Sequence, residues 1–215
     1  MTKLTVVGVC HSDRDKNYPK VIDYVKKIPL ESKVSLETRF SIEGLLTIPP
    51  DILDFEQSHC LRFFWSIAKH LDKKGIEMAP IENNEIYELQ NLASNRLNMG
   101  DLNPESVHYK QIKDYFCALS FLRSLSMYNA ARNNESTHAI VGALHAYQIQ
   151  QIGFDVETIY FSKVPHEDIE ISLKQIDEYK NKGYIQLPNF SIETVRILNG
   201  ERPKSLLTRV LEHFM

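Results

Sequence analysis

The chain has 215 residues, of which 43% are hydrophobic and 25% charged, the composition of an ordinary globular protein. Its formal net charge is −3 and its lysines and arginines are scattered among acidic residues, which argues against nucleic acid or an anionic membrane as a partner. No apolar run approaches the length of a membrane span and no linker-like tract divides the chain, so we expect one domain over residues 1–215.

In chain order, β-branched apolar runs alternate with amphipathic helical patterns. Strands are predicted over residues 3–10, 33–37, 76–81, 139–144 and 156–161, with a possible further strand over residues 184–187. Helices are predicted over residues 17–28, 57–73, 84–98, 105–133 and 165–182, with a short helix ending at Gly153, another beginning at Ser191, and irregular structure or a short helix over residues 45–55. The alternation predicts an α/β fold with a mostly parallel central sheet flanked by helices, whose ligands collect at the carboxyl ends of the strands.

The last predicted helix carries an apolar stripe, formed by Leu206, Leu207, Val210, Leu211 and Phe214. We expect this stripe to pack on the domain itself, and a homodimer contact is the alternative. Either partner would remove the stripe from water, as an amphipathic helix requires.

The three cysteines, Cys10, Cys60 and Cys117, are widely spaced within apolar stretches. This pattern is typical of reduced thiols, because it offers neither a disulfide framework nor a zinc-binding spacing. The first ten residues read as a strand and not as a signal peptide. We therefore expect a cytoplasmic protein.

A short apolar run that leads into G-x-x-H occurs twice. The first copy ends at His11 and the second at His145. Each run is too short for a helix of its own and reads as a buried parallel strand that delivers one side chain to the edge of the sheet. Taken singly, such a histidine is more often a capping or loop residue, but the repetition favours two histidines at one functional site.

Two acidic residues and one arginine are placed to join these histidines. Glu37 and Glu82 each follow a predicted strand, and Arg123 lies on an otherwise apolar stripe of the longest helix. A carboxylate beside buried surface needs a partner, which either Arg39 or Arg123 can supply. Imidazoles and carboxylates that meet at strand ends can bind a divalent metal ion, or form a general base with its orienting acid.

Four stretches, in this order, resemble the TraB/Tiki family within the broader erythromycin esterase-like and ChaN-like fold. They read Val-Val-Gly-Val-Cys-His11, Val-Ser-Leu-Glu37-Thr-Arg39, Leu-Arg123-Ser-Leu-Ser-Met127 and Ile-Val-Gly-Ala-Leu-His145. In that family a strand ends in G-x-x-H, the next in an acid followed by an arginine, a helix carries Arg and Met four residues apart, and a second G-x-x-H follows. The resemblance covers most of residues 3–161 and implies a site of His11, Glu37 and His145, supported by Arg123 and Arg39. Arg39, Arg123 and Tyr147, which follows the second G-x-x-H, are the candidate substrate contacts.

The residues and the resemblance support three functional hypotheses. In the first, His11, Glu37 and His145 bind Mn, Co, Fe or Zn, and a metal-bound water attacks an amide or ester bond of a peptide or small-molecule substrate, with Glu82 as a further ligand or base. In the second, the hydrolase has no metal: one histidine, held by Glu37, is the base, and Arg123 binds a substrate anion. In the third, the histidines bind haem or another small ligand without turnover. The resemblance implies all three, since Tiki-like members are associated with metal-dependent peptide hydrolysis, esterase-like members with water activation by histidine and glutamate, and ChaN-like members with haem binding.

Overall fold

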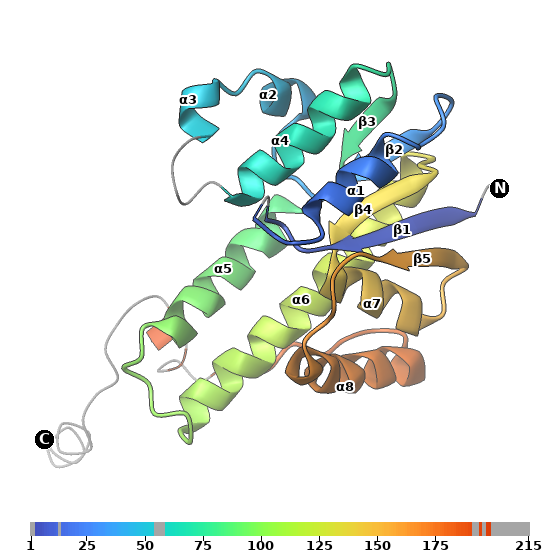
Figure 1. Cartoon of the computed structure of the whole chain (residues 1–215). Coiled ribbons are helices and arrows are strands. Elements are labelled where there is room, and N and C mark those ends of the chain that lie inside the picture. The colour runs from blue at the N-terminus through green and yellow to red at the C-terminus, as the bar shows by residue number, and fades with distance from the viewer. Residues whose placement is uncertain (1–2, 13, 54–58, 191–193, 195–196, 199–215) are drawn as a thin grey trace, which may run out of the picture.

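The computed structural model of the protein describes residues 3–12, 14–53, 59–190, 194 and 197–198 (Figure 1). Within these residues, five parallel strands form one sheet with the order β3-β2-β4-β1-β5. The strands are β1 (Leu4–Val9), β2 (Lys33–Leu36), β3 (Glu77–Pro80), β4 (His138–Gly142) and β5 (Val156–Tyr160). Helices flank the sheet, so the predicted α/β fold with a parallel central sheet is confirmed.

The described helices are α1 (Tyr18–Val25), α2 (Ile42–Leu46), α3 (Pro50–Leu53), α4 (His59–Asp72), α5 (Asn84–Asn98), α6 (Val107–Asn133), α7 (Ala143–Ile152) and α8 (His166–Lys182). One predicted boundary is wrong in a way that matters for the site. The strand predicted over residues 139–144 ends at Gly142, and α7 begins directly at Ala143, so His145 lies in the first turn of a helix. Of the helices described here, none is both long and apolar enough to cross a membrane.

The register of the sheet brings three strand ends side by side. Val9 of β1 pairs with Gly142 of β4, and Leu36 of β2 pairs with Ile140 of β4. The backbone N–H of Glu37 extends this ladder by donating to the carbonyl of Ile140 at 3.0 Å. The residues that follow β1, β2 and β4 therefore meet at one edge of the sheet.

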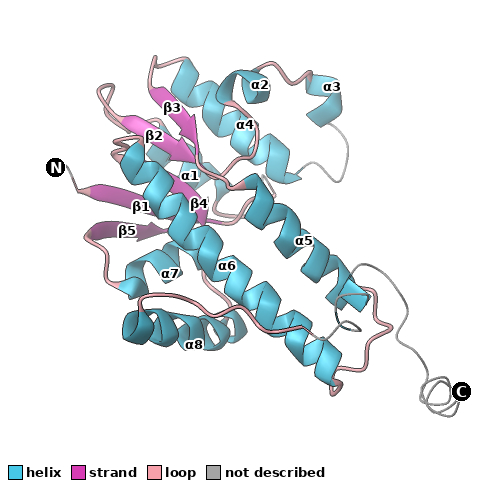
Figure 2. Cartoon of the chain, turned by 180° about the vertical axis from the view of Figure 1, so that it is seen from behind, coloured by secondary structure: helices cyan, strands magenta, loops and turns pink. Residues whose placement is uncertain are grey.

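Side chains of the strands alternate between two hydrophobic cores, as in a sheet that is covered on both faces. In β1, Val7 and Val9 pack with α1 and α4, whereas Leu4 and Val6 pack with α6 and α7. Figure 2 shows the second face, where α6 crosses the sheet with α5 beside it. The neighbouring strands β1 and β4 thus lead into helices on opposite faces, α1 and α7. Such a switch point is where open parallel sheets form ligand sites.

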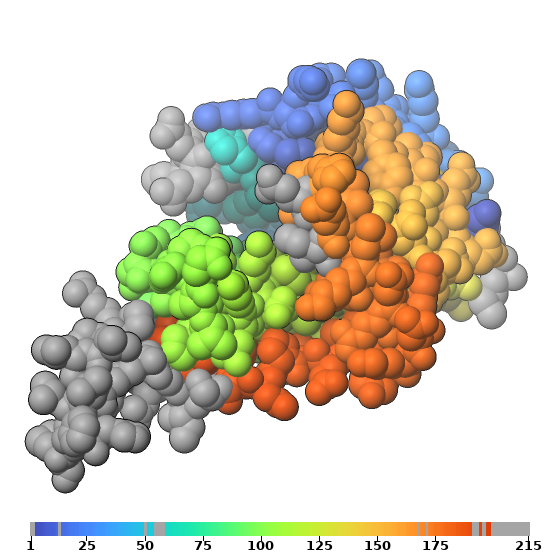
Figure 3. Space-filling model, turned by 90° about the horizontal axis from the view of Figure 1, so that it is seen from below, coloured from blue at the N-terminus to red at the C-terminus, as the bar shows by residue number. Residues whose placement is uncertain are grey.

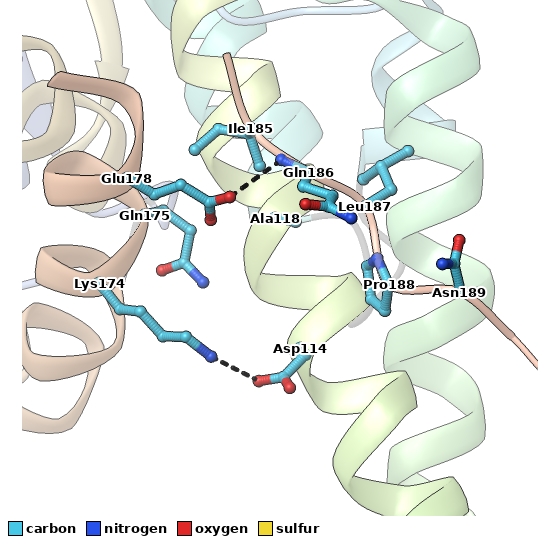
Figure 4. Close-up of a pocket in the computed structure, with 10 residues that line it drawn as sticks. All are labelled: Asp114, Ala118, Lys174, Gln175, Glu178, Ile185, Gln186, Leu187, Pro188 and Asn189. Atoms are coloured by element: carbon cyan, nitrogen blue, oxygen red, sulfur yellow. Dashed lines mark hydrogen bonds and ion pairs between the residues drawn. The ribbon is translucent and has the colours of Figure 1, made fainter. Parts of the chain in front are cut away.

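After α8 the chain turns back across α6 and α8 as an irregular segment, so the strand predicted over residues 184–187 is wrong (Figure 4). No neighbouring strand of the described sheet lies beside it, and a side chain holds its backbone instead: Glu178 accepts the N–H of Gln186 at 3.3 Å. Next to this contact, Lys174 lies 3.7 Å from Asp114 across a pocket of about 230 Å³. The helix predicted from residue 191 and its stripe over residues 206–214 lie outside the described residues, apart from residues 194 and 197–198.

Candidate functional site

Five residues that are far apart in the sequence meet in one pocket of about 720 Å³ at the carboxyl edge of the sheet, namely His11, Glu37, Glu82, Arg123 and His145. The first three follow β1, β2 and β3, whereas Arg123 belongs to α6 and His145 to the first turn of α7. The pocket therefore occupies the switch point between β1 and β4, as expected for a ligand site in a parallel sheet.

Glu37 is the centre of this group. Its Oε2 accepts the backbone N–H of Gly142 at 2.6 Å and lies 3.3 Å from Nε2 of His11. Its Oε1 accepts a hydrogen bond from Arg123 Nη2 at 3.0 Å and lies 3.6 Å from Nε2 of His145. Each carboxylate oxygen thus contacts one N–H donor and one imidazole.

Arg123 joins the two acidic residues. Its Nε donates to Glu82 Oε1 at 3.0 Å, and its Nη2 donates to Glu82 Oε2 as well as to Glu37. Its Nη1 donates to Gln90 Oε1 at 2.5 Å, and its guanidinium lies 5.0 Å from the centre of the Tyr87 ring. The side chain is only 10% exposed, so this cation is a buried clamp shared by two carboxylates.

The charges around Glu37 set the protonation of the site. Burial opposes the charged form of His11, but the Glu37 carboxylate, assisted by the Cys60 thiol, outweighs it and raises the pKa of His11 to about 10. Burial alone would raise the pKa of Glu37, yet His11, His145 and Arg123 together lower it below the usual range of a carboxyl. Burial lowers the pKa of His145 to about 4 in spite of Glu37. At neutral pH one histidine is therefore a cation and the other is neutral.

A chain of polar side chains fixes the ring of His145. Nδ1 of His145 is hydrogen-bonded to Ser124 Oγ at 2.7 Å, Ser124 donates to Gln148 Oε1 at 2.5 Å, and the Gln148 amide nitrogen donates to Ser172 Oγ at 2.9 Å. The Ser124 hydroxyl has one proton, and the short contact assigns it to Gln148 in preference to the Ser120 carbonyl at 3.2 Å. With that assignment Ser124 accepts from His145, and the proton of the neutral ring is on Nδ1. The Nε2 of His145, in the lining of the pocket, lies 3.6 Å from Glu37 Oε1, which is beyond hydrogen-bonding distance.

The glycines of the two G-x-x-H motifs have different roles. A Cβ on Gly142 would lie 3.3 Å from Cε1 of His11 and 3.4 Å from Cδ2 of His145, so this glycine leaves space for both rings. A Cβ on Gly8 would lie 2.9 Å from Cβ of Ala146, so this glycine lets α7 approach β1. The repeated glycine thus leaves space at the site in one copy and allows helix–sheet packing in the other.

Apolar side chains form much of the pocket wall. The ring of Phe64 meets that of His11 edge-on, with centroids 4.8 Å apart. Further apolar wall residues are Phe40, Ile52, Leu61, Tyr87 and Leu144. The histidines therefore face a space that suits an organic molecule with an apolar body.

The other two candidate substrate contacts, Arg39 and Tyr147, lie in different pockets. Arg39 lines the pocket, but its half-exposed guanidinium pairs with Glu88 at 3.0 Å, so the partner of Glu37 is Arg123. Tyr147 lines a separate pocket beyond α7.

Sequence reasoning did not find Ser124, Gln148 or Gln90. These are neutral polar residues on helices, and no spacing distinguishes them from surface residues. The one available signal was that Ser124 directly follows Arg123 within an apolar stretch, which indicates burial and hence a need for a partner.

The candidate metal ligands are engaged with one another. Among the residues that the structure describes, no group of three or more His, Cys, Asp or Glu side chains is arranged to hold a metal ion. Glu37 stands between the two histidines, and its oxygens already accept N–H groups of Gly142 and Arg123. A metal ion on Glu37 Oε1 would also face the guanidinium 3.0 Å from that oxygen. This arrangement does not fit a bound divalent ion, and the metal and haem hypotheses stay predictions.

Comparison with protein-family models, with curated proteins and with solved structures finds no match to this chain. The resemblance to the TraB/Tiki family therefore also stays a prediction.

Proposed function

We propose that the protein is a metal-independent hydrolase that cleaves an ester or amide bond of a small organic molecule with water as the nucleophile. The observation that carries this proposal is the placement of His145, whose Nδ1 is hydrogen-bonded to Ser124 and whose ring lines the pocket beside Glu37. An imidazole held in one tautomer, with its free nitrogen in a cavity, has the geometry of a general base.

In the proposed reaction, Nε2 of His145 takes a proton from a water molecule as the water oxygen attacks the substrate carbonyl carbon. The carbonyl oxygen becomes negatively charged, and the cationic ring of His11 lies in the same pocket to stabilise it. The first-turn N–H groups of α7, at Ala143 and Leu144, have no acceptor within the helix and supply further donors. His145 then returns the proton to the leaving oxygen or nitrogen, which gives an acid and an alcohol or amine.

Glu37 and Arg123 act as positioning residues in this scheme. Glu37 holds the ring of His11 and, through the N–H of Gly142, the start of α7 that carries His145. All three nitrogens of Arg123 are engaged by Glu37, Glu82 and Gln90. We therefore assign Arg123 to holding the carboxylates and not to binding the substrate.

The test is hydrolysis of p-nitrophenyl acetate, butyrate and octanoate and of the matching p-nitroanilides by protein dialysed against EDTA, with metal content measured by mass spectrometry. We expect turnover by metal-free protein and a loss of about 10²-fold or more in His145→Gln and in Glu37→Gln. His166→Gln, which changes a histidine whose side chain is 83% exposed at the start of α8, is the matched control and should keep full activity. Circular dichroism melts establish that each variant is folded.

Two results would contradict the proposal. Activity that disappears on chelation and returns with Mn, Co, Fe or Zn would favour the metal-dependent hydrolase. Absence of turnover with and without metal would remove both hydrolase hypotheses, and haem titration of wild type and His11→Ala would then test ligand binding.

A further inference from the structure

A second pocket of about 900 Å³ lies at the carboxyl ends of β1 and β5. Cys10, residues 15–17 and Lys20, which follow β1, form one side of it, and residues 160–164, at the end of β5, form another. Figure 3 shows these two segments, blue and orange, next to each other on the surface. Helix α7 lines both pockets. It contributes Leu144 to the candidate site, and Tyr147 and Gln150 to the second pocket.

The charged residues around the second pocket are mostly cations. Lys16, Lys20 and Lys163 line it, and the described residues give none of them an acidic partner. The one acidic residue of the lining, Asp15, already accepts the N–H of Asn17 at 2.7 Å. Unpaired ammonium groups around a concave surface attract anions.

The start of α1 adds to this positive character. Asn17, at the N-cap position, makes no side-chain capping bond, and the first turn contains no acidic residue. The partial positive charge of the helix terminus adds to the charge of the lysines, and the Asp15 carboxylate, which accepts the N–H of Asn17, offsets part of it.

Much of the remaining wall is apolar or aromatic. Tyr160 is 39% exposed and is fixed by the hydrogen bond of its hydroxyl to Gln150 at 2.9 Å. Phe161, Val164 and Ile169 line the same space. Aromatic rings beside free cations suit a ligand with an apolar body and an anionic end.

We propose that this second pocket binds a small molecule that carries a carboxylate, sulfonate or phosphate group on an aromatic or aliphatic body. The anionic group lies among Lys16, Lys20 and Lys163, and the body lies against Tyr160 and Phe161. This site does not depend on the hydrolase proposal, because none of its residues belongs to the His11, Glu37 and His145 group.

Cys10 makes the pocket testable, because this exposed thiol lines it. In a Cys60→Ser/Cys117→Ser background, iodoacetate and iodoacetamide alkylate Cys10 by the same displacement of iodide, and they differ in charge alone. We expect the rate ratio of iodoacetate to iodoacetamide to fall about tenfold when the three lysines become glutamine. Both reagents react with the same thiolate, so a change in the ionised fraction of Cys10 affects both rates equally and leaves their ratio unchanged. The control replaces Lys27, Lys73 and Lys113, exposed lysines outside the pocket, and should leave the ratio unchanged.

The apolar half of the proposal is tested with two probes. Anilinonaphthalene sulfonate should protect Cys10 from iodoacetamide, whereas phenylnaphthylamine, the same ring system without the sulfonate, should protect it at least about tenfold less well. Tyr160→Ala should weaken protection by the sulfonate and leave the iodoacetate preference intact.

The proposal is overturned if the lysine replacements do not change the rate ratio, or if the two probes protect equally or not at all. Thermal melts show that the variants are folded, and since no readout uses hydrolysis, failure here is distinct from failure of the hydrolase proposal.

Discussion

Glu37 accepts the backbone N–H of Gly142 at 2.6 Å, which ties the end of β2 to the N-cap position of α7. A carboxylate is stabilised there because the first N–H groups of a helix lack internal acceptors and carry partial positive charge. The same carboxylate contacts His11 and Arg123. One side chain therefore fixes the relative positions of the two strand ends that carry the histidines.

Replacing Arg123 with methionine should lower the free energy of unfolding by about 3–5 kcal/mol, because Glu37 and Glu82 would remain buried beside each other without their cation. Urea denaturation measures this change. Arg39→Met is the matched control: it removes a half-exposed arginine at the rim and should cost less than about 1 kcal/mol. Adding Glu82→Gln to Arg123→Met should recover part of the loss, and a double variant no more stable than the single one would contradict the clamp.

The contribution of His11 to stability should depend on pH in a defined direction. Its pKa in the folded protein is raised to about 10, from 6.5. The ion pair with Glu37 therefore contributes fully below about pH 6.5 and is lost as the pH rises through about 10. The difference in unfolding free energy between wild type and His11→Gln should be largest near pH 6 and shrink toward pH 10, as measured by urea titrations at intermediate values. A difference for His11→Gln that is constant with pH would refute the pairing.

Replacing Ser124 with alanine should release the ring of His145. The substitution leaves the Nδ1–H of His145 and the Oε1 of Gln148 without their partner, at a cost of about 1–3 kcal/mol. Nitrogen-15 NMR of the imidazole should show the Nδ1-protonated tautomer in wild type and a mixture in Ser124→Ala. Ser172→Ala removes only the far end of the chain and should preserve the tautomer, so an equal change in both variants would argue against direct control by Ser124.

The two motif glycines should respond differently to alanine. Gly8→Ala places a methyl group 2.9 Å from Cβ of Ala146 and should reduce stability by about 1–3 kcal/mol through overpacking of α7 on β1. Gly142→Ala meets ring atoms of His11 and His145 at 3.3–3.4 Å and should lower hydrolysis more than stability. Thermal melts and p-nitrophenyl ester assays on both variants provide the comparison, and identical profiles would contradict separate roles.

Much of the fold could be predicted because strand and helix periods are local properties of the sequence. The ends of those strands also placed His11, Glu37 and Glu82 at one edge, since parallel strands share their direction. The start of α7 was misplaced, because Gly-Ala-Leu-His continues an apolar strand pattern as well as it begins a helix. The irregular course of residues 184–187 depends on a side-chain contact from α8, which no local pattern encodes.

The details of the candidate site depend on tertiary packing. The choice of Arg123 over Arg39 as partner of Glu37 requires knowing that a side chain of α6 reaches the residues after β2 and β3, and sequence spacing does not contain that information. Ser124 and Gln148 contribute to the site through the ring of His145. Neither residue is charged, and neither belongs to a periodic pattern that the sequence displays. Tyr147 lies only two residues beyond His145, yet it lines a different pocket.

The strand order has a consequence for synthesis of the chain. β4 lies between β1 and β2, although β1, β2 and β3 all precede it in the sequence. Until residues 138–142 have left the ribosome, β4 is missing. The strands that precede His11 and Glu37 then lack the strand that lies between them. Non-local strand pairing of this kind forms late, after the loop closure it requires. The ribosome therefore produces more than half of this protein before the candidate site can form.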